Sequence, residues 1–311
     1  MFKIENLVNR AAQKYQYHIY TTIVFIVFSH MLNSFIQAII AGFMIFSVGL
    51  IHGANDLQLI QKKTQKKSKK IFLQSLLFYI LVVLVGVFLF YLLPSFGLFF
   101  FIVFSAFHFG EQHLESKVET GRSSIFKWLL YTSYGCALFG LLFTLQWETV
   151  HAVIGQISGQ HISKQSTELL FFAGLIGFLL VGLFSPALRK LLLFETMLLL
   201  LLGLLFARTT LIFGFGFYFV VWHSIPSVKD QLNFLYPSDS MGAWKYIKSS
   251  LPYWIMSLIG LVGVYFFFDI QSASFLPLFF SFLAAITFPH TVVMGWLKLS
   301  EQKSNGLAEQ S

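Results

Sequence analysis

Four histidines stand in short polar motifs inside otherwise apolar stretches of the 311-residue sequence. They are His52 in HGAND, His108 in FHFGEQH, His223 in WHSIPS and His290 in FPHTVVM. A neutral imidazole in an apolar surrounding is costly unless its nitrogens have partners, so such residues indicate a functional site. The chemistry open to several convergent imidazoles, one from each helix of a bundle, is metal binding.

Three carboxylates follow these histidines at spacings of four, three and seven residues, which place the acid and the imidazole on one helical face. The pairs are His52 with Asp56, His108 with Glu111, and His223 with Asp230. A carboxylate so placed can accept the second imidazole N–H and fix the orientation of the ring. Glu195 is the only carboxylate well inside an apolar run. We expect it to be either a further partner of this kind or a protonated acid bonded to the backbone.

The other five histidines are expected to lie outside this site. His113 follows His108 by five residues, which is about 140° around a helix, so it is a poor co-ligand. The remaining four are predicted near the ends of apolar segments or in a loop, and they are His18, His30, His151 and His161.

Composition places these motifs in a membrane. Apolar residues make up 57% of the chain, charged residues only 11%, and the mean hydropathy is +0.75. In a typical soluble protein about a quarter of the residues are charged, and they cover its surface. The single cysteine, Cys136, excludes a disulfide framework and a cysteine-ligated iron–sulfur cluster. We therefore predict an all-α polytopic membrane protein with one integral domain over residues 1–311 and short cytoplasmic tails at 1–16 and 298–311.

Ten apolar segments are predicted to cross the membrane, which takes about 20 residues for each helix. They lie near 17–33, 36–54, 71–93, 96–112, 126–147, 168–185, 190–207, 209–225, 251–268 and 274–297. With a cytoplasmic N-terminus, the C-terminus is cytoplasmic too, and Lys164 and Arg208 are the only two of the 21 Lys and Arg residues on the outer side. Positive charge gathers on the cytoplasmic side of membrane proteins in this way. We expect a multi-pass protein of the cell membrane.

The four motif histidines fall on even-numbered predicted spans, each one to two turns from the cytoplasmic end. A metal centre explains this common depth, whereas the alternative is four unrelated histidines that bond to the backbone or line a polar vestibule. The common depth favours the metal centre. Ligation by histidines alone suits iron(II), copper or zinc. Iron(II) with open coordination positions would suit the activation of oxygen on a lipid-soluble substrate.

In their order along a Phe-rich polytopic chain, HGAND, FHFGEQH, WHS and FPH resemble the motifs of Brp/Blh-type β-carotene 15,15'-dioxygenases over about residues 48–295. The resemblance implies an oxidoreductase that cleaves the central double bond of β-carotene with O₂, on Fe(II) held by histidines, and gives two molecules of retinal. By motif, His52, His108 and His223 carry over as iron ligands. Members of the family can carry a second histidine four residues after the WH histidine, where this chain has Ser227. We therefore expect His290 to be the fourth ligand.

The same resemblance implies binding partners, and three alternative functions remain to be weighed against it. The expected partners are an apolar carotenoid, O₂ and membrane lipid, with retinal passed to a retinal-binding rhodopsin and no nucleic acid bound. A metal or proton transporter is one alternative, although it would place ionisable groups at both depths of the membrane. A di-iron membrane lipid hydroxylase is another, although the HxxxH and HxxHH clusters of that class are absent from this sequence. A bis-histidine haem protein is the third.

Overall fold

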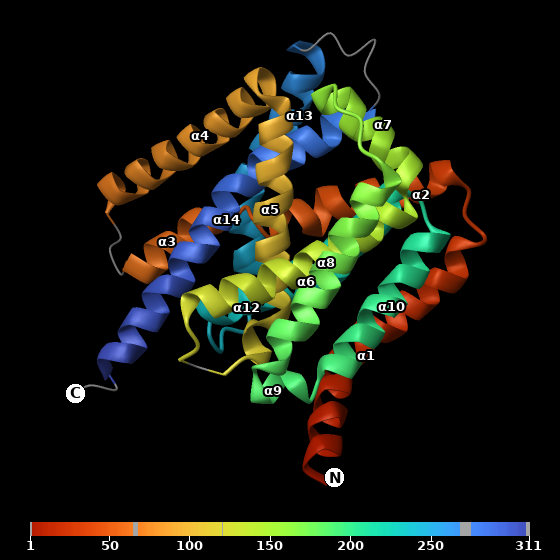
Figure 1. The fold of residues 1–311 in the computed structure, drawn as a ribbon. Helices are drawn as coiled ribbons and strands as arrows, with labels where there is room; N and C mark the ends of the chain where they lie inside the picture. Colours follow the sequence, from red (N-terminus) through yellow and green to blue (C-terminus); the bar gives the residue numbers. More distant parts are fainter. Residues whose placement is uncertain (1, 65–67, 120, 268–274, 309–311) are drawn as a thin grey trace. The chain divides into compact units, whose positions relative to one another are not determined.

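The structure is a computed structural model that describes residues 2–64, 68–119, 121–267 and 275–308 (Figure 1). These residues form helices and turns, and none of them belongs to a strand, which confirms the predicted all-α class for this part of the chain. The α-helices are α1 (Phe2–Ser29), α2 (Ser34–Met44), α3 (Asp56–Thr64), α4 (Lys69–Leu92), α5 (Pro94–Leu114), α6 (Ser124–Leu145), α7 (Trp147–Ser158), α8 (Lys164–Leu183), α9 (Pro186–Arg189), α10 (Leu192–Arg208), α11 (Leu211–Phe217), α12 (Ile225–Leu235), α13 (Gly242–Phe267) and α14 (Phe275–Ala308). Two π-helices, η1 (Ile45–Gly49) and η3 (Tyr218–Ser224), and a 3₁₀-helix, η2 (Glu115–Lys117), complete the helical elements.

The chain divides into two compact units, and each collects segments that are far apart in the sequence. Unit 1 comprises Met1–Ile45, Ile102–Gly155 and Gln160–Ser224, and unit 2 comprises Phe46–Phe101, Gln156–Gly159 and Ile225–Ser311. Unit 1 therefore holds His108 and His223, and unit 2 holds His52 and His290. That residues 1–311 form one membrane domain stays a prediction.

Six stretches of the described residues are long and apolar enough to cross a membrane. They are Lys69–Leu92, Pro94–Lys117, Ser124–Leu145, Lys164–Leu183, Leu211–Leu235 and Leu276–Leu297, and each coincides with a predicted span. The predicted spans near 17–33, 36–54, 190–207 and 251–268 coincide with other helices; Ser34–Gly49, for example, is apolar but shorter. Residues 268 and 274, at the edges of two predicted spans, lie outside the described residues. The count of ten spans and the side on which the termini lie stay predictions.

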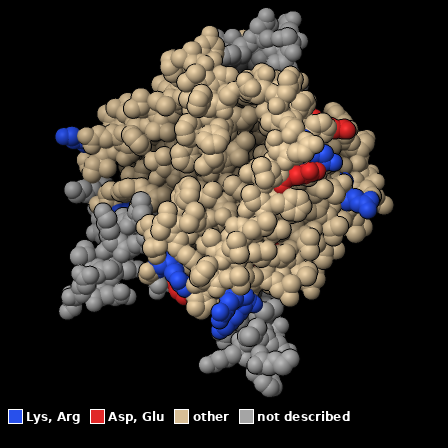
Figure 2. All heavy atoms as spheres, in the orientation of Figure 1, with Lys and Arg blue, Asp and Glu red and all other residues tan. Residues whose placement is uncertain are grey.

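The surface of the long apolar helices is itself apolar. Leu77, Leu84, Phe88 and Tyr91 of α4 are all exposed, and almost no residue of that helix is buried. Figure 2 shows the same character on one face of the molecule, where uncharged residues cover most of the surface and charged ones are few. Contiguous exposed apolar surface of this extent marks contact with a membrane or another apolar partner. These helices are therefore those of a membrane protein.

Glycines let the helices of unit 1 come into backbone contact. A Cβ on Gly135 of α6 would lie 1.9 Å from the backbone oxygen of Ala106 on α5. A Cβ on Gly110 of α5 would lie 1.9 Å from the backbone oxygen of Tyr131 on α6. On its other side α6 packs against α8 (Figure 1). Because Gly110 is two residues from His108, this close approach fixes the part of α5 that carries the histidine.

In unit 2, α14 packs against α4 and α3 (Figure 1). The buried side chains of Leu59, Leu235, Tyr246, Val293 and Leu297 form a cluster that joins α3, α12, α13 and α14. Burial of a leucine or valine side chain contributes about 1.5–3 kcal/mol, so this cluster is a main source of stability for the unit. Two of its members, Val293 and Leu297, follow His290 on α14. The cluster therefore anchors the helix that carries His290.

The chain around two of the predicted ligands is not regular α-helix. After α2 and η1, residues His52–Asn55 form turns, and α3 begins at Asp56. Gly53 disfavours helix, and the backbone oxygen of Asn55 accepts hydrogen bonds from the N–H groups of Gln58 and Leu59, as a residue that precedes a new helix does. His223 lies within η3. π-Helical turns are rare and occur frequently at functional sites.

The backbone contact between α5 and α6 predicts a large effect of one methyl group. Gly135→Ala should destabilise the protein by at least about 1–3 kcal/mol, the usual cost of overpacking, because the atom in contact is a backbone oxygen that cannot move aside. Thermal unfolding in detergent measures the change. The control is Gly260→Ala on α13, where nothing lies within 4 Å of the added Cβ; it should be neutral or stabilise by up to about 1 kcal/mol. Equal stability of Gly135→Ala and wild type would contradict the close approach.

Candidate metal centre

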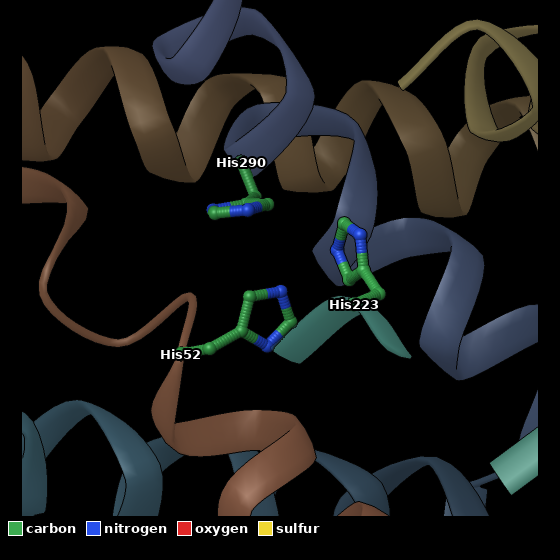
Figure 3. A group of neighbouring side chains, drawn as sticks. All are labelled: His52, His223 and His290. Atoms are coloured by element: carbon green, nitrogen blue, oxygen red, sulfur yellow. The ribbon is translucent and has the colours of Figure 1, made fainter. Parts of the chain in front are cut away.

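In unit 2 the imidazoles of His52 and His290 lie against each other. Their ring centroids are 4.7 Å apart and the rings are nearly perpendicular, at 80° (Figure 3). Both residues are buried, with exposed fractions of 5% for His52 and 3% for His290. His52 comes from the turn after η1, and His290 from the middle of α14, directly after Pro289. Two segments separated by more than two hundred residues thus contribute to one pair.

The carboxylate of Asp56 fixes the ring of His290. Nδ1 of His290 lies 2.9 Å from Oδ1 and 3.1 Å from Oδ2 of Asp56, and the hydroxyl of Tyr79 donates to Oδ2 at 3.3 Å. A carboxylate only accepts hydrogen bonds, so Nδ1 of His290 carries the proton and Nε2 keeps its lone pair. A carboxylate that holds Nδ1–H while Nε2 faces a metal is the usual arrangement around metal-bound histidines.

Asp56 was predicted to support His52, and the structure pairs it with His290 instead. The prediction assumed that a regular helix continues from His52 to Asp56, which would place both on one face. Turns at His52–Asn55 break that helix, so the spacing of four residues no longer sets the face. His52 uses a backbone partner, because its Nδ1 donates to the carbonyl oxygen of Gly49 in η1. This contact also leaves the lone pair of His52 on Nε2.

In unit 1 the imidazoles of His108 and His223 form a second pair. Their centroids are 4.9 Å apart at an angle of 75°, and both residues are buried, with an exposed fraction of 2%. Phe109 and Phe219 pack on the ring of His223, with centroids 4.5 Å and 5.7 Å from it. The side chain of Gln112 donates a hydrogen bond of 3.0 Å to the backbone oxygen of His223 and so links α5 to η3.

Glu111 and Asp230 are the two carboxylates predicted to support this pair. Their positions differ from that of Asp56, which bonds directly to His290. Glu111 approaches His108 with 4.0 Å between Oε2 and Nδ1, which is beyond the distance of a hydrogen bond. Asp230 is exposed on α12. The helical face that the sequence spacing predicts therefore brings Glu111 near its histidine, but without a direct bond.

Glu195 belongs to a separate buried network in unit 1. Its carboxylate lies 2.7 Å from Nζ of Lys117 and 2.8 Å from Nε2 of His113, and all three residues are buried. The ring of His113 also stacks on Tyr134, with centroids 4.7 Å apart. The two roles expected for Glu195 were support of a ligand and a bond to the backbone; the structure shows an ion pair with a lysine. The spacing of four residues suggests one helical face for His113 and Lys117, but no signal in the sequence pairs that face with Glu195 of α10.

The ring separations in both pairs fit two imidazoles on one ion. With metal–nitrogen bonds of about 2.0–2.1 Å and tetrahedral or octahedral angles, two bound imidazoles have centroids roughly 4.5–5.2 Å apart. The values of 4.7 Å and 4.9 Å lie in this range. His52 and His290 in unit 2, and His223 in unit 1, are buried histidines that each offer one imidazole nitrogen to a metal (Figure 3). The fold and these side chains therefore define a helical membrane protein with histidines suited to hold a metal.

Comparison with known proteins identifies the family. The sequence model described as beta-carotene 15,15'-dioxygenase matches residues 43–298, a range that includes all four motif histidines. The chain belongs to this family, which confirms the resemblance seen in the motifs. Among curated proteins and among solved structures, nothing matches the chain.

The contact between Asp56 and His290 predicts the effect of removing one charge. Asp56→Asn should weaken metal binding by about 10–100-fold, the usual loss when a carboxylate behind a metal-bound histidine is changed. The amide keeps the shape of the side chain but not its charge, so the protein should still fold. Anaerobic titration of the purified protein with iron(II) measures the affinity. Asp239→Asn, which alters a half-buried acid paired with Lys245 outside the site, is the control and should bind as wild type does. If Asp56→Asn binds iron(II) as tightly as the wild type does, the role of Asp56 is structural only.

Proposed function

We propose that this protein cleaves β-carotene at its central 15,15' double bond with O₂ and gives two molecules of retinal. Membership of the beta-carotene 15,15'-dioxygenase family is the observation that carries the proposal. The buried histidines support it, because they offer imidazole nitrogens to a metal in a helical, apolar protein. The reaction balances without a further reductant, since both atoms of O₂ enter the two aldehyde groups and the carbon–carbon double bond is broken.

We propose His52, His108, His223 and His290 as the ligands of one iron(II) ion. Imidazole is a ligand that suits iron, and iron supplies the activation of O₂ when it is bound. In unit 2, the bonds to Gly49 and Asp56 hold His52 and His290 in the tautomer that presents Nε2. In unit 1, the ring contact of His108 with His223 supports their use as a second pair of ligands.

The other residues of the site position these histidines and keep water away. Phe109 and Phe219 cover the ring of His223 with apolar surface, which suits a substrate that is a hydrocarbon. Asp56 and Tyr79 hold the ring of His290, and the proton on its Nδ1 stays between the nitrogen and the carboxylate. Glu111 is a candidate for a weaker role of the same kind at His108. Glu195 acts at a distance, through the network that steadies α5.

The proposed surroundings follow from the same function. A carotenoid is dissolved in lipid, so the enzyme would take it from the bilayer through its apolar surface. We propose the cell membrane as the location, with ten spans and both termini in the cytoplasm. Retinal leaves as an apolar aldehyde and would pass through lipid to a retinal-binding protein such as a rhodopsin.

Expression in a β-carotene-producing host tests the function directly. The wild type should bleach the orange cells and yield retinal on chromatography. His52→Ala, His108→Ala, His223→Ala and His290→Ala should each lower retinal at least about 100-fold and reduce iron in the purified protein to background, because each loses a ligand. His161→Ala, which removes an exposed imidazole, is the matched control and should behave as wild type.

Two outcomes would contradict the proposal. Unchanged carotene with a folded, iron-loaded wild type would exclude the reaction. Full iron content and activity in His290→Ala would show that the fourth position belongs to another group.

His113→Ala distinguishes a ligand from a structural histidine. This variant should unfold at a lower temperature than the wild type but keep its iron.

A further inference from the structure

A glutamine outside the predicted site holds the backbone of His52. Nε2 of Gln231, on α12, donates a hydrogen bond of 2.9 Å to the carbonyl oxygen of His52. Gln231 is 3% exposed, and both residues belong to unit 2. A hydrogen bond to this carbonyl matters more than one to a helical carbonyl, because His52 begins the turns that separate η1 from α3.

The amide of Gln231 is itself fixed on both sides. Its Nε2 also donates to the hydroxyl oxygen of Ser227 at 3.1 Å, and its Oε1 accepts from the hydroxyl of Tyr246 at 2.8 Å. The two amide hydrogens thus face two acceptors, and the amide oxygen faces a donor. The opposite orientation of the amide would place its oxygen against the carbonyl of His52. A fully satisfied buried network of this kind makes its members rigid.

The same network reaches the far end of the turn. The side chain of Asn55 donates to the backbone oxygen of Tyr246 at 3.1 Å and accepts from the hydroxyl of Ser249 at 2.7 Å. The HGAND turn is therefore tied to α12 at His52 and to α13 at Asn55. Since a turn lacks the regular bonds of a helix, these ties fix the main chain that carries the His52 ring.

Unit 1 contains the same kind of contact. Gln112 of α5 donates to the carbonyl oxygen of His223 at 3.0 Å. In each unit, then, a glutamine amide holds the main-chain carbonyl of a histidine that stands beside or within a π-helix. The two glutamines come from different elements, and no spacing in the sequence links either of them to the histidine whose carbonyl it holds.

We propose that Gln231 is a positioning residue of the metal centre, which acts by holding the main chain of His52 and is itself held by Tyr246 and Ser227. The proposal rests on the function proposed above, because it assumes that His52 binds the metal. It also gives Ser227 a role other than that of a ligand: its hydroxyl accepts the second amide hydrogen of Gln231.

Anaerobic titration of the purified protein with iron(II) tests this proposal, combined with thermal unfolding of the metal-free protein. Gln231→Met keeps the length of the side chain but removes its hydrogen bonds. We expect iron affinity to fall about 10–100-fold, with the unfolding temperature of the metal-free protein close to that of the control. The control is Gln58→Met, which loses a bond from the hydroxyl of Tyr236 at 3.2 Å in the same unit. It should bind iron as wild type does.

A second pair of variants keeps the proposal testable if Gln231→Met does not fold. Tyr246→Phe and Tyr236→Phe each remove one tyrosine hydroxyl that donates to a glutamine, at 2.8 Å and 3.2 Å. Only Tyr246→Phe should weaken iron binding, and it should also shift the visible spectrum of the cobalt(II)-loaded protein, which reports the ligand geometry. Ser227→Ala should give a smaller loss of the same kind.

The outcomes separate this proposal from the one on which it rests. If the wild type binds iron and Gln231→Met or Tyr246→Phe binds it equally well, the positioning role is wrong and the proposed metal centre stands. If iron affinity and metal-free stability fall together in these variants and in both controls, the glutamine is merely structural and the proposal is again overturned. A wild type that binds no iron overturns both.

Discussion

The hydrogen bond between the Asp56 carboxylate and Nδ1 of His290 is the interaction on which the rest of the proposed site depends. A carboxylate and an imidazole buried in an apolar surrounding each cost several kcal/mol unless they have partners. Here they are partners of each other, at 2.9 Å, with the Tyr79 hydroxyl as a further donor. The pairing defines which nitrogen of His290 can bind a metal. It also ties α14 to the start of α3, and so sets His290 against the HGAND turn that carries His52.

Three of the four proposed ligands lie at departures from regular helix, whereas His108 lies within α5. His52 follows η1 and lies in a turn, His223 lies in η3, and His290 follows a proline in α14. A regular helix offers only the positions that its period allows, whereas a π-turn, a break or a proline changes the direction of a side chain. The side-chain amides of Gln231 and Gln112 hold the backbone at two of these places. The chemistry of the site thus requires local structure that helix propensity alone would not select.

The sequence predicts the helical class, the long apolar helices and the four motif histidines, because hydropathy and the cost of a buried imidazole act locally. It does not predict that Asp56 would bond His290, since the break at Gly53 changes the face on which Asp56 lies. It does not predict the pairing of Glu195 with Lys117 and His113 either, because a contact between α10 and the end of α5 depends on packing. Gln231 was missed for a different reason. Glutamine is common, and nothing in its spacing from Ser227 and Tyr246 distinguishes a buried network from a polar helical face.

The proposed metal centre is one iron ion held by imidazoles from four parts of the chain. X-ray absorption at the iron edge of the iron-loaded, purified protein tests it most directly, together with the iron content per chain. For this site we expect one iron per chain, a first shell of nitrogen and oxygen only, and outer-shell scattering from four imidazoles. A short iron–iron distance, a sulfur ligand, or scattering from fewer than three imidazoles would contradict it.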